Sequence, residues 1–281
     1  MIDSRFFILF SFICWHHVSG ETVSDKEIVE KCLWSISSSK PDSVSGAMVQ
    51  SALFLLETPY VGGTLEVNAK EELVINLREL DCTTLVENCL ALSLTHSSGK
   101  DSFETFTNNL QKIRYRKGEI NGYLSRLHYS SDWIYENETS GYLKDITQEI
   151  GGRTWPLRVS FMSSNASLYP HLKKHPEDIP FLKATEDSIN ARQHDYIPKE
   201  EIPACESNIQ DGDLIYFVTS IEGLDISHVG IAYRINGRLT FIHASSKAKK
   251  VIVNPESLSE YCKRSKSNLG IVVCRINNGI N

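Results

Sequence analysis

The sequence predicts an α+β fold, with N-terminal helices packed on a C-terminal antiparallel sheet or partial barrel. Apolar residues recur at helical spacing up to about residue 113, and segments after residue 205 alternate as strands do. The pair Asn236-Gly237 lies between two of these strand-like segments and is a strong hairpin signal. A chain of 281 residues with 41% hydrophobic content can bury a sizeable core.

Four helices are expected in the N-terminal half. Ser24 and Asp25 can cap the first of them, and turn residues at 58–63 end the second. The expected ranges are 26–37, 41–56, 82–97 and 103–113. Residues 118–205 follow as a long irregular stretch rich in Gly, Pro, Asn and aromatic residues, and we interpret it as an insertion.

The C-terminal part is expected to form strands at 213–218, 227–235, 238–244, 250–253 and 270–276. If Asn236-Gly237 forms the hairpin turn, Ile235 pairs with Arg238. His228 then lies opposite Ser245, and His243 opposite Gly230. Side chains alternate between faces, so the two histidines become diagonal neighbours on one face, roughly 7 Å apart or less. We expect Gly230 to leave space there for the two imidazoles to hydrogen-bond.

Cys82 and Cys89 fall on the same expected helix. Roughly 10 Å of helical rise separates them, so they cannot form a disulfide with each other. Cys89 shares the apolar stripe and is expected in the core. Cys82 lies at the helix start, where free N–H groups can lower a thiol pKa and bind an oxyanion.

The sequence does not determine whether the cysteines form disulfides, or which of them would pair. Six cysteines follow residue 20 and allow up to three disulfides, but a chain of this size does not need them. They are Cys32, Cys82, Cys89, Cys205, Cys262 and Cys274. Neither a CxxC nor an HExxH motif occurs, so the sequence predicts no metal site and no cofactor.

The N-terminus has the pattern of a secretory signal peptide. Arg5 precedes the apolar run 6–14, and small residues at 18–20 offer a cleavage site. We therefore expect residues 1–20 to be removed and residues 21–281 to form a single domain, in the periplasm or secreted. A buried N-terminal strand is the alternative interpretation.

Charge and hydropathy exclude some partners. The formal net charge is −6 and no basic stripe stands out, which argues against a nucleic-acid partner. No segment after residue 20 approaches the roughly 18 apolar residues of a membrane span, so no stable membrane insertion is expected. Nothing in the sequence indicates an oligomeric state.

Five motifs in order resemble the NlpC-type cell-wall hydrolases, which are papain-like cysteine peptidases and amidases acting on bacterial peptidoglycan. They are PYVGG (59–63), LDCTTLV (80–86), GDLIYF (212–217), SHVGIAY (227–233) and FIHAS (241–245). The resemblance implies that Cys82 is the nucleophile, His228 the general base and His243 the residue that orients it. It also implies that Tyr60 assists the oxyanion site.

Two departures point to one branch of this family. Thr83-Thr84 replaces the common Ser-Gly, and Cys82 lies much farther from His228 than in minimal members. With RLHYSSDWIYEN (126–137), these features resemble the N-acetylmuramoyl-L-alanine amidases. By that resemblance Asp132 and Trp133 are substrate-binding candidates, although a helix cap and a core aromatic are equally good interpretations. Asp81 and Ser227, which flank the nucleophile and the base, are further substrate-binding candidates.

The resemblance implies an exported amidase that takes muramyl peptides and cleaves between the muramoyl group and L-alanine through a thioester. One alternative is an endopeptidase that cleaves the bond between D-glutamate and the diamino acid. Another is a muropeptide-binding protein without catalysis. A Cys–His pair further predicts activity that changes with pH around neutrality.

Overall fold

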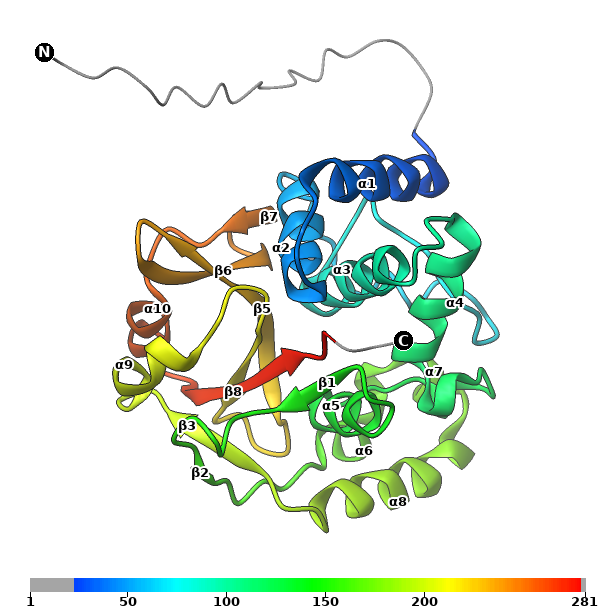
Figure 1. Cartoon of the computed structure of the whole chain (residues 1–281). Coiled ribbons are helices and arrows are strands. Elements are labelled where there is room, and N and C mark those ends of the chain that lie inside the picture. The colour runs from blue at the N-terminus through cyan, green and yellow to red at the C-terminus, as the bar shows by residue number, and fades with distance from the viewer. Residues whose placement is uncertain (1–22, 279–281) are drawn as a thin grey trace, which may run out of the picture.

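The computed structural model describes residues 23–278 and shows helices followed by an antiparallel sheet, as predicted (Figure 1). The α-helices are α1 Asp25–Ser39, α2 Val44–Phe54, α3 Cys82–Ser97, α4 Phe103–Arg114, α5 Ser130–Thr139, α6 Phe161–Ser164, α7 Pro170–Lys174, α8 Ile179–Asn190, α9 Ile202–Cys205 and α10 Leu258–Arg264. The strands are β1 Leu143–Asp145, β2 Arg153–Thr154, β3 Asp195–Pro198, β4 Leu214–Thr219, β5 Ile226–Ile235, β6 Arg238–Ser245, β7 Lys250–Val253 and β8 Asn268–Ile276. The signal-peptide prediction for residues 1–20 lies outside the described residues.

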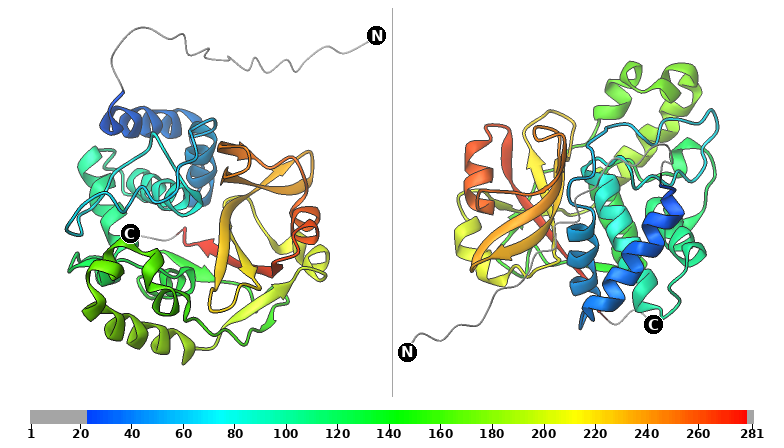
Figure 2. Two further views of the ribbon diagram at one scale, coloured as in Figure 1. Left: turned by 180° about the vertical axis from the view of Figure 1, so that it is seen from behind. Right: turned by 90° about the horizontal axis from the view of Figure 1, so that it is seen from above.

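The sheet runs in the order β2-β3-β8-β4-β5-β6-β7, with β1 also paired to β8. Along each strand, successive side chains point alternately into two cores on opposite faces of the sheet, as strand geometry requires. On one face, Val229 and Ile242 pack with the helices α1 to α5, and Cys89 belongs to this core. On the other face, Phe217 and Phe241 pack with α9 and α10. The sheet thus lies between two helical layers, which the two views of Figure 2 show from behind and from above.

Residues 118–205 are more ordered than the sequence suggested. They form several helices, of which α5 and α8 are the longest, and the strand β3 joins the main sheet beside β8. A separate small apolar cluster, which includes Tyr129, Met162 and Leu182, holds much of this segment together. Its apolar residues are spread over short helices and turns, so no single window shows a clear period.

Local sequence fixes the elements around the cysteine. Asp81 caps α3, accepting from the Thr84 backbone N–H at 2.8 Å, and Thr84 Oγ1 accepts in return from the Asp81 N–H at 2.9 Å. This reciprocal capping box fixes where the helix begins. It also gives Thr84, one of the two residues that depart from the family pattern, a structural role.

All six cysteines after residue 20 are free thiols, and Cys82 is the one that is not fully buried. None of the helices that the structure describes is long and apolar enough to cross a membrane. Within residues 23–278, no three His, Cys, Asp or Glu side chains gather in a way that could hold a metal ion.

Candidate active site

The hairpin places the two histidines as the turn chemistry predicted. Ile235 pairs with Arg238, and the β5–β6 pairing continues to Ile231 and Ile242. His228 Nε2 and His243 Nδ1 then lie 2.7 Å apart, with the rings nearly perpendicular at 83°. The register prediction is confirmed, and the imidazoles form a hydrogen-bonded pair.

The space beside Gly230 differs from the expectation. We expected it to stay empty, but the Phe241 ring fills it, and a Cβ on Gly230 would lie 2.6 Å from Phe241 Cδ2. Phe241 also packs on His243 with ring centroids 4.7 Å apart. Gly230 therefore serves the site indirectly, since it admits the ring that supports His243.

A bulge in β5 precedes His228. The pairing of β4 with β5 shifts register after the pair Phe217–His228, and this leaves Ser227 as the extra residue. Bulges bend a strand and redirect its side chains, and they are common beside active sites. Ser227 is exposed and lines a pocket together with His228 and His243.

Cys82 lies at the first turn of α3, against β5. The backbone N–H of Val229, next to His228, donates to the Cys82 sulfur, and the half-buried Tyr60 lies close enough for its phenol to be influenced by that sulfur. No hydrogen bond joins Cys82 to His228 among the described residues. The structure therefore brings the nucleophile candidate against the strand that carries the base candidate, without a hydrogen bond between the two side chains.

Backbone pairing fixes Tyr60 in this arrangement. The Tyr60 segment pairs with Leu80, two residues before Cys82, and the Tyr60 N–H donates to Lys249 O at 2.9 Å. The turn region after α2 is thus an extended bridge between the start of α3 and the β6–β7 loop. Burial, with smaller effects of Cys82 and Asp81, raises the pKa of Tyr60, so the phenol stays a neutral donor.

Protonation in the site is set by burial. Burial and the Asp81 carboxylate raise the pKa of the Cys82 thiol to about 11, although hydrogen bonds from Val229 and Thr83 oppose this shift. Burial lowers the pKa of His228 to about 4, and burial with the neighbouring His228 lowers the pKa of His243 to about 3. The expectation of a lowered thiol pKa is wrong for this conformation, because desolvation outweighs the helix terminus. Thiol and imidazole are both neutral here.

The remaining substrate-binding candidates have other contacts. Asp132 is buried, with one carboxylate oxygen bonded to Arg192 at 2.8 Å and the other to Arg116 at 2.5 Å. Trp133 is buried against Tyr216, with ring centroids 6.2 Å apart. Asp81 is the helix cap of α3. These contacts give a structural account of all three residues, and a role of Asp132 or Trp133 in substrate binding stays a prediction.

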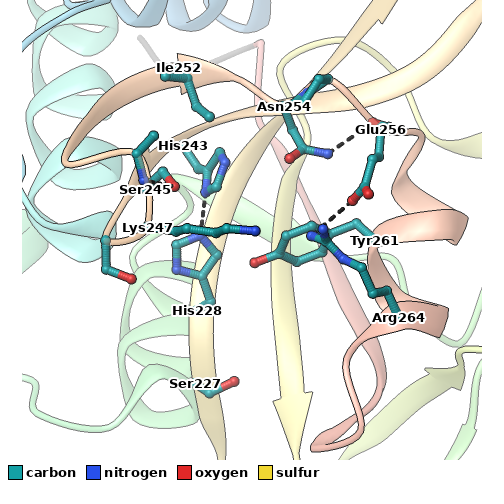
Figure 3. A pocket seen from close by; sticks show the side chains of 13 residues that line it. Ser227, His228, His243, Ser245, Lys247, Ile252, Asn254, Glu256, Tyr261 and Arg264 are labelled. Carbon is teal, nitrogen blue, oxygen red and sulfur yellow. Dashed lines mark hydrogen bonds and ion pairs between the residues drawn. The ribbon is translucent and has the colours of Figure 1, made fainter.

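Sequence reasoning missed the pocket wall opposite the histidines. It consists of α10 and the loops around β7, and its residues include Lys247, Asn254, Tyr261 and Arg264 (Figure 3). The pocket has a volume of about 550 Å³. The sequence did carry a signal for α10, since Ser257 and Glu260 form a capping box of the S-x-x-E type.

Comparison with known structures gives close matches. The chain is similar to an N-acetylmuramoyl-L-alanine amidase from Bacteroides uniformis, with 42% identity and a TM-score of 0.80 over 83% of this chain and 99% of that one. It is also similar to a Bacteroides fragilis protein with the provisional name xylanase, with 42% identity and a TM-score of 0.78 over 81% and 100%.

A Legionella pneumophila protein at 23% identity shares the fold, with a TM-score of 0.68 over 89% of this chain and 94% of that one. No curated protein sequence matches the chain. The wider NlpC-type, papain-like superfamily indicated by the sequence motifs stays a prediction. The match of residues 50–271 to a family model shows that the chain belongs to the AmiA-like family, described as N-acetylmuramoyl-L-alanine amidase-like.

Proposed function

We propose that this protein is an exported cysteine amidase that cleaves the N-acetylmuramoyl–L-alanine bond of muropeptides through a thioester. Its family and its similarity to a Bacteroides amidase support a peptidoglycan amidase in general. The observation that carries the cysteine mechanism is the 2.7 Å hydrogen bond between His228 and His243, on the strand whose Val229 contacts the Cys82 sulfur.

The proposed role of His228 as the base implies an assignment of its two ring nitrogens. A base must accept a proton at Nδ1, so Nε2 carries the hydrogen and donates to His243 Nδ1. His243 therefore acts as a positioning residue that fixes the ring and its tautomer. With its pKa lowered to about 4, the imidazole is neutral at neutral pH and keeps the lone pair of its unprotonated nitrogen.

The reaction then follows in two halves. His228 takes the proton of the Cys82 thiol as the sulfur attacks the lactyl carbonyl carbon, and the carbonyl electron pair moves to oxygen. Tyr60 and backbone N–H groups at the start of α3 are the candidate donors to that oxyanion. The C–N bond breaks as His228 returns the proton to the alanine nitrogen, leaving a thioester. Water, deprotonated by His228, cleaves the thioester, releases the muramic acid carboxylate and restores the thiol.

The name xylanase on one similar structure raises a second enzyme class. Glycosidases of the common type place two carboxyl groups on either side of the scissile bond. The pocket beside the histidines is lined by a single acidic residue, Glu256, and its carboxylate pairs with Arg264 at 2.9 Å. The absence of a carboxylate pair from the described lining of this pocket supports acyl transfer over glycoside hydrolysis.

The test is incubation with a defined muramoyl-tripeptide followed by mass spectrometry. We expect a free muramic acid derivative and an intact peptide, whereas an endopeptidase would leave a shortened peptide on the sugar. Cys82→Ala should lower turnover at least about 10³-fold. Cys89→Ala, the same change two turns along the same helix in the core, is the matched control and should keep turnover. Unchanged turnover by Cys82→Ala would end the proposal, and so would a shortened peptide.

A further inference from the structure

The pocket beyond the two histidines has a chemistry of its own. It opens beside His228 and His243 on β5 and β6, and its far wall is formed by α10 and the loops flanking β7 (Figure 3). Its lining is mostly polar and includes two cationic side chains, Lys247 and Arg264. The lining residues that can donate are Ser227, His243, Ser245, Ser246, Lys247, Asn254, Tyr261 and Arg264.

The lining has two cationic side chains, and only one of them forms an ion pair with a described acidic side chain. Arg264 pairs with Glu256 at 2.9 Å, so its charge is neutralised within the pocket wall. Lys247 makes no ion pair with any described residue, and its side chain extends along the pocket toward Tyr261 (Figure 3). The pocket therefore carries one uncompensated positive charge, in a chain whose formal net charge is −6.

His243 adds an independent observation. Its Nε2 is buried and has no hydrogen-bond partner among the described residues, while the residue is 3% exposed. With His228 in the tautomer of a base, His243 Nδ1 accepts and Nε2 must carry a hydrogen. A buried N–H donor without a partner costs free energy, so we expect a bound ligand to provide the missing hydrogen-bond acceptor.

The position of the pocket relative to His228 indicates which half of a substrate can enter it. His228 must protonate the leaving nitrogen, so the leaving group lies beside its ring. Because that same ring also lines the pocket, the leaving group and the pocket lie against one side chain. In a muramyl peptide the leaving group is the peptide, and its second residue, D-glutamate, keeps a free carboxylate.

We propose that this pocket is a subsite for the anionic stem peptide, in which Lys247 binds a peptide carboxylate and sets specificity for charged over amidated stems. The inference rests on the proposed function, because the peptide must leave from the His228 side. The positioning of Lys247 has a structural basis, since the Ala248 N–H donates to Ser245 Oγ at 3.1 Å and closes the loop that carries it.

The test measures binding in a Cys82→Ala background, where the ligand stays intact. The probes are muramoyl-L-alanyl-D-glutamate and its analogue with both glutamate carboxyls replaced by carboxamides. We expect the carboxylate form to bind about ten-fold more tightly, as for a hydrogen bond to a charged group. Adding Lys247→Ala should bring the ratio of the two dissociation constants to about one. Lys247→Arg should retain most of the preference.

Lys263→Ala is the matched control, because Lys263 is an exposed lysine of α10 outside the pocket lining, and it should leave the ten-fold ratio in place. Equal binding of the two probes to the Cys82→Ala protein would overturn the inference, as would a ratio that survives Lys247→Ala. Turnover by the native protein is a separate readout. A native protein that binds the carboxylate form preferentially but hydrolyses neither probe would refute the amidase reaction and leave the subsite standing.

Discussion

Two regions with buried ionisable groups show how differently such groups can be used. In the first, around Asp132, charges are paired: Arg116 and Arg192 bind its two oxygens, and Arg116 also binds Glu136 at 2.9 Å. In the second, at the active site, Cys82, His228 and His243 are desolvated without an opposite charge beside them.

The difference separates a structural network from a reactive one. A buried charge is stable when it is paired and hydrogen-bonded, as Asp132 is. Groups that are buried without compensation become neutral and keep unused donors, such as His243 Nε2. The fully paired Asp132 therefore fits a role in stabilising the fold. The unpartnered His243 Nε2 beside the pocket fits a role in binding a ligand.

The largest expected effect is on stability, at the paired region. Asp132→Asn leaves Arg192 without its carboxylate partner and Arg116 with Glu136 alone, so the free energy of unfolding should fall by about 3 kcal/mol. Denaturant unfolding measures this change. Glu136→Gln, at the edge of the same network, should cost clearly less. A loss of kcat/KM with an unchanged unfolding midpoint would instead support the substrate-binding role that the motif suggested.

The second prediction concerns the reactive region. His243→Ala removes the acceptor that holds His228 in its working tautomer, so kcat should fall about 10²–10³-fold. Steady-state kinetics on a muramyl peptide provide the measurement. The control is His128→Gln, which changes a partly buried histidine that is bonded to Tyr123 O at 2.9 Å outside the site. Equal losses of kcat in the two variants would show that His243 acts only through the fold.

A smaller effect is expected from the oxyanion donor. Tyr60→Phe deletes one hydroxyl while keeping the ring, and kcat should fall about 10- to 100-fold with little change in KM. Tyr115→Phe provides the contrast, because that hydroxyl donates to Glu71 at 2.8 Å and should affect stability alone. An unaltered kcat in Tyr60→Phe would remove Tyr60 from the reaction.

The smallest effect is that of pH near neutrality. His228 is protonated and inactive only as the pH falls through about 4, and the Cys82 thiol ionises only near a pKa of about 11. The profile of kcat/KM should therefore be nearly level between about pH 5 and pH 9 and fall on the acid side. The sequence predicts a change around neutrality instead, so the measured profile distinguishes the two expectations. A clear limb between pH 6 and 8 would show that thiolate and imidazolium form in solution.

Much of the fold and part of the site followed from local rules. The periodicity of the first four helices and the five predicted strands depends on neighbouring residues, and so does the Asn236-Gly237 turn. That turn alone set the register that joins His228 to His243. The start of α3 at Cys82 likewise followed from its flanking residues, which form the capping box.

The tertiary structure alone decided the charge states and the pocket. Whether Asp132 is paired depends on Arg192, sixty residues away in the chain, and the pKa shifts of Cys82 and His228 depend on burial by several elements. Lys247 and Tyr261 meet the histidines only because β7 and α10 fold back over the site. Spacing and periodicity depend on residues that are close in the sequence. Desolvation and charge pairing depend on all the groups around a residue, and only folding brings those groups together.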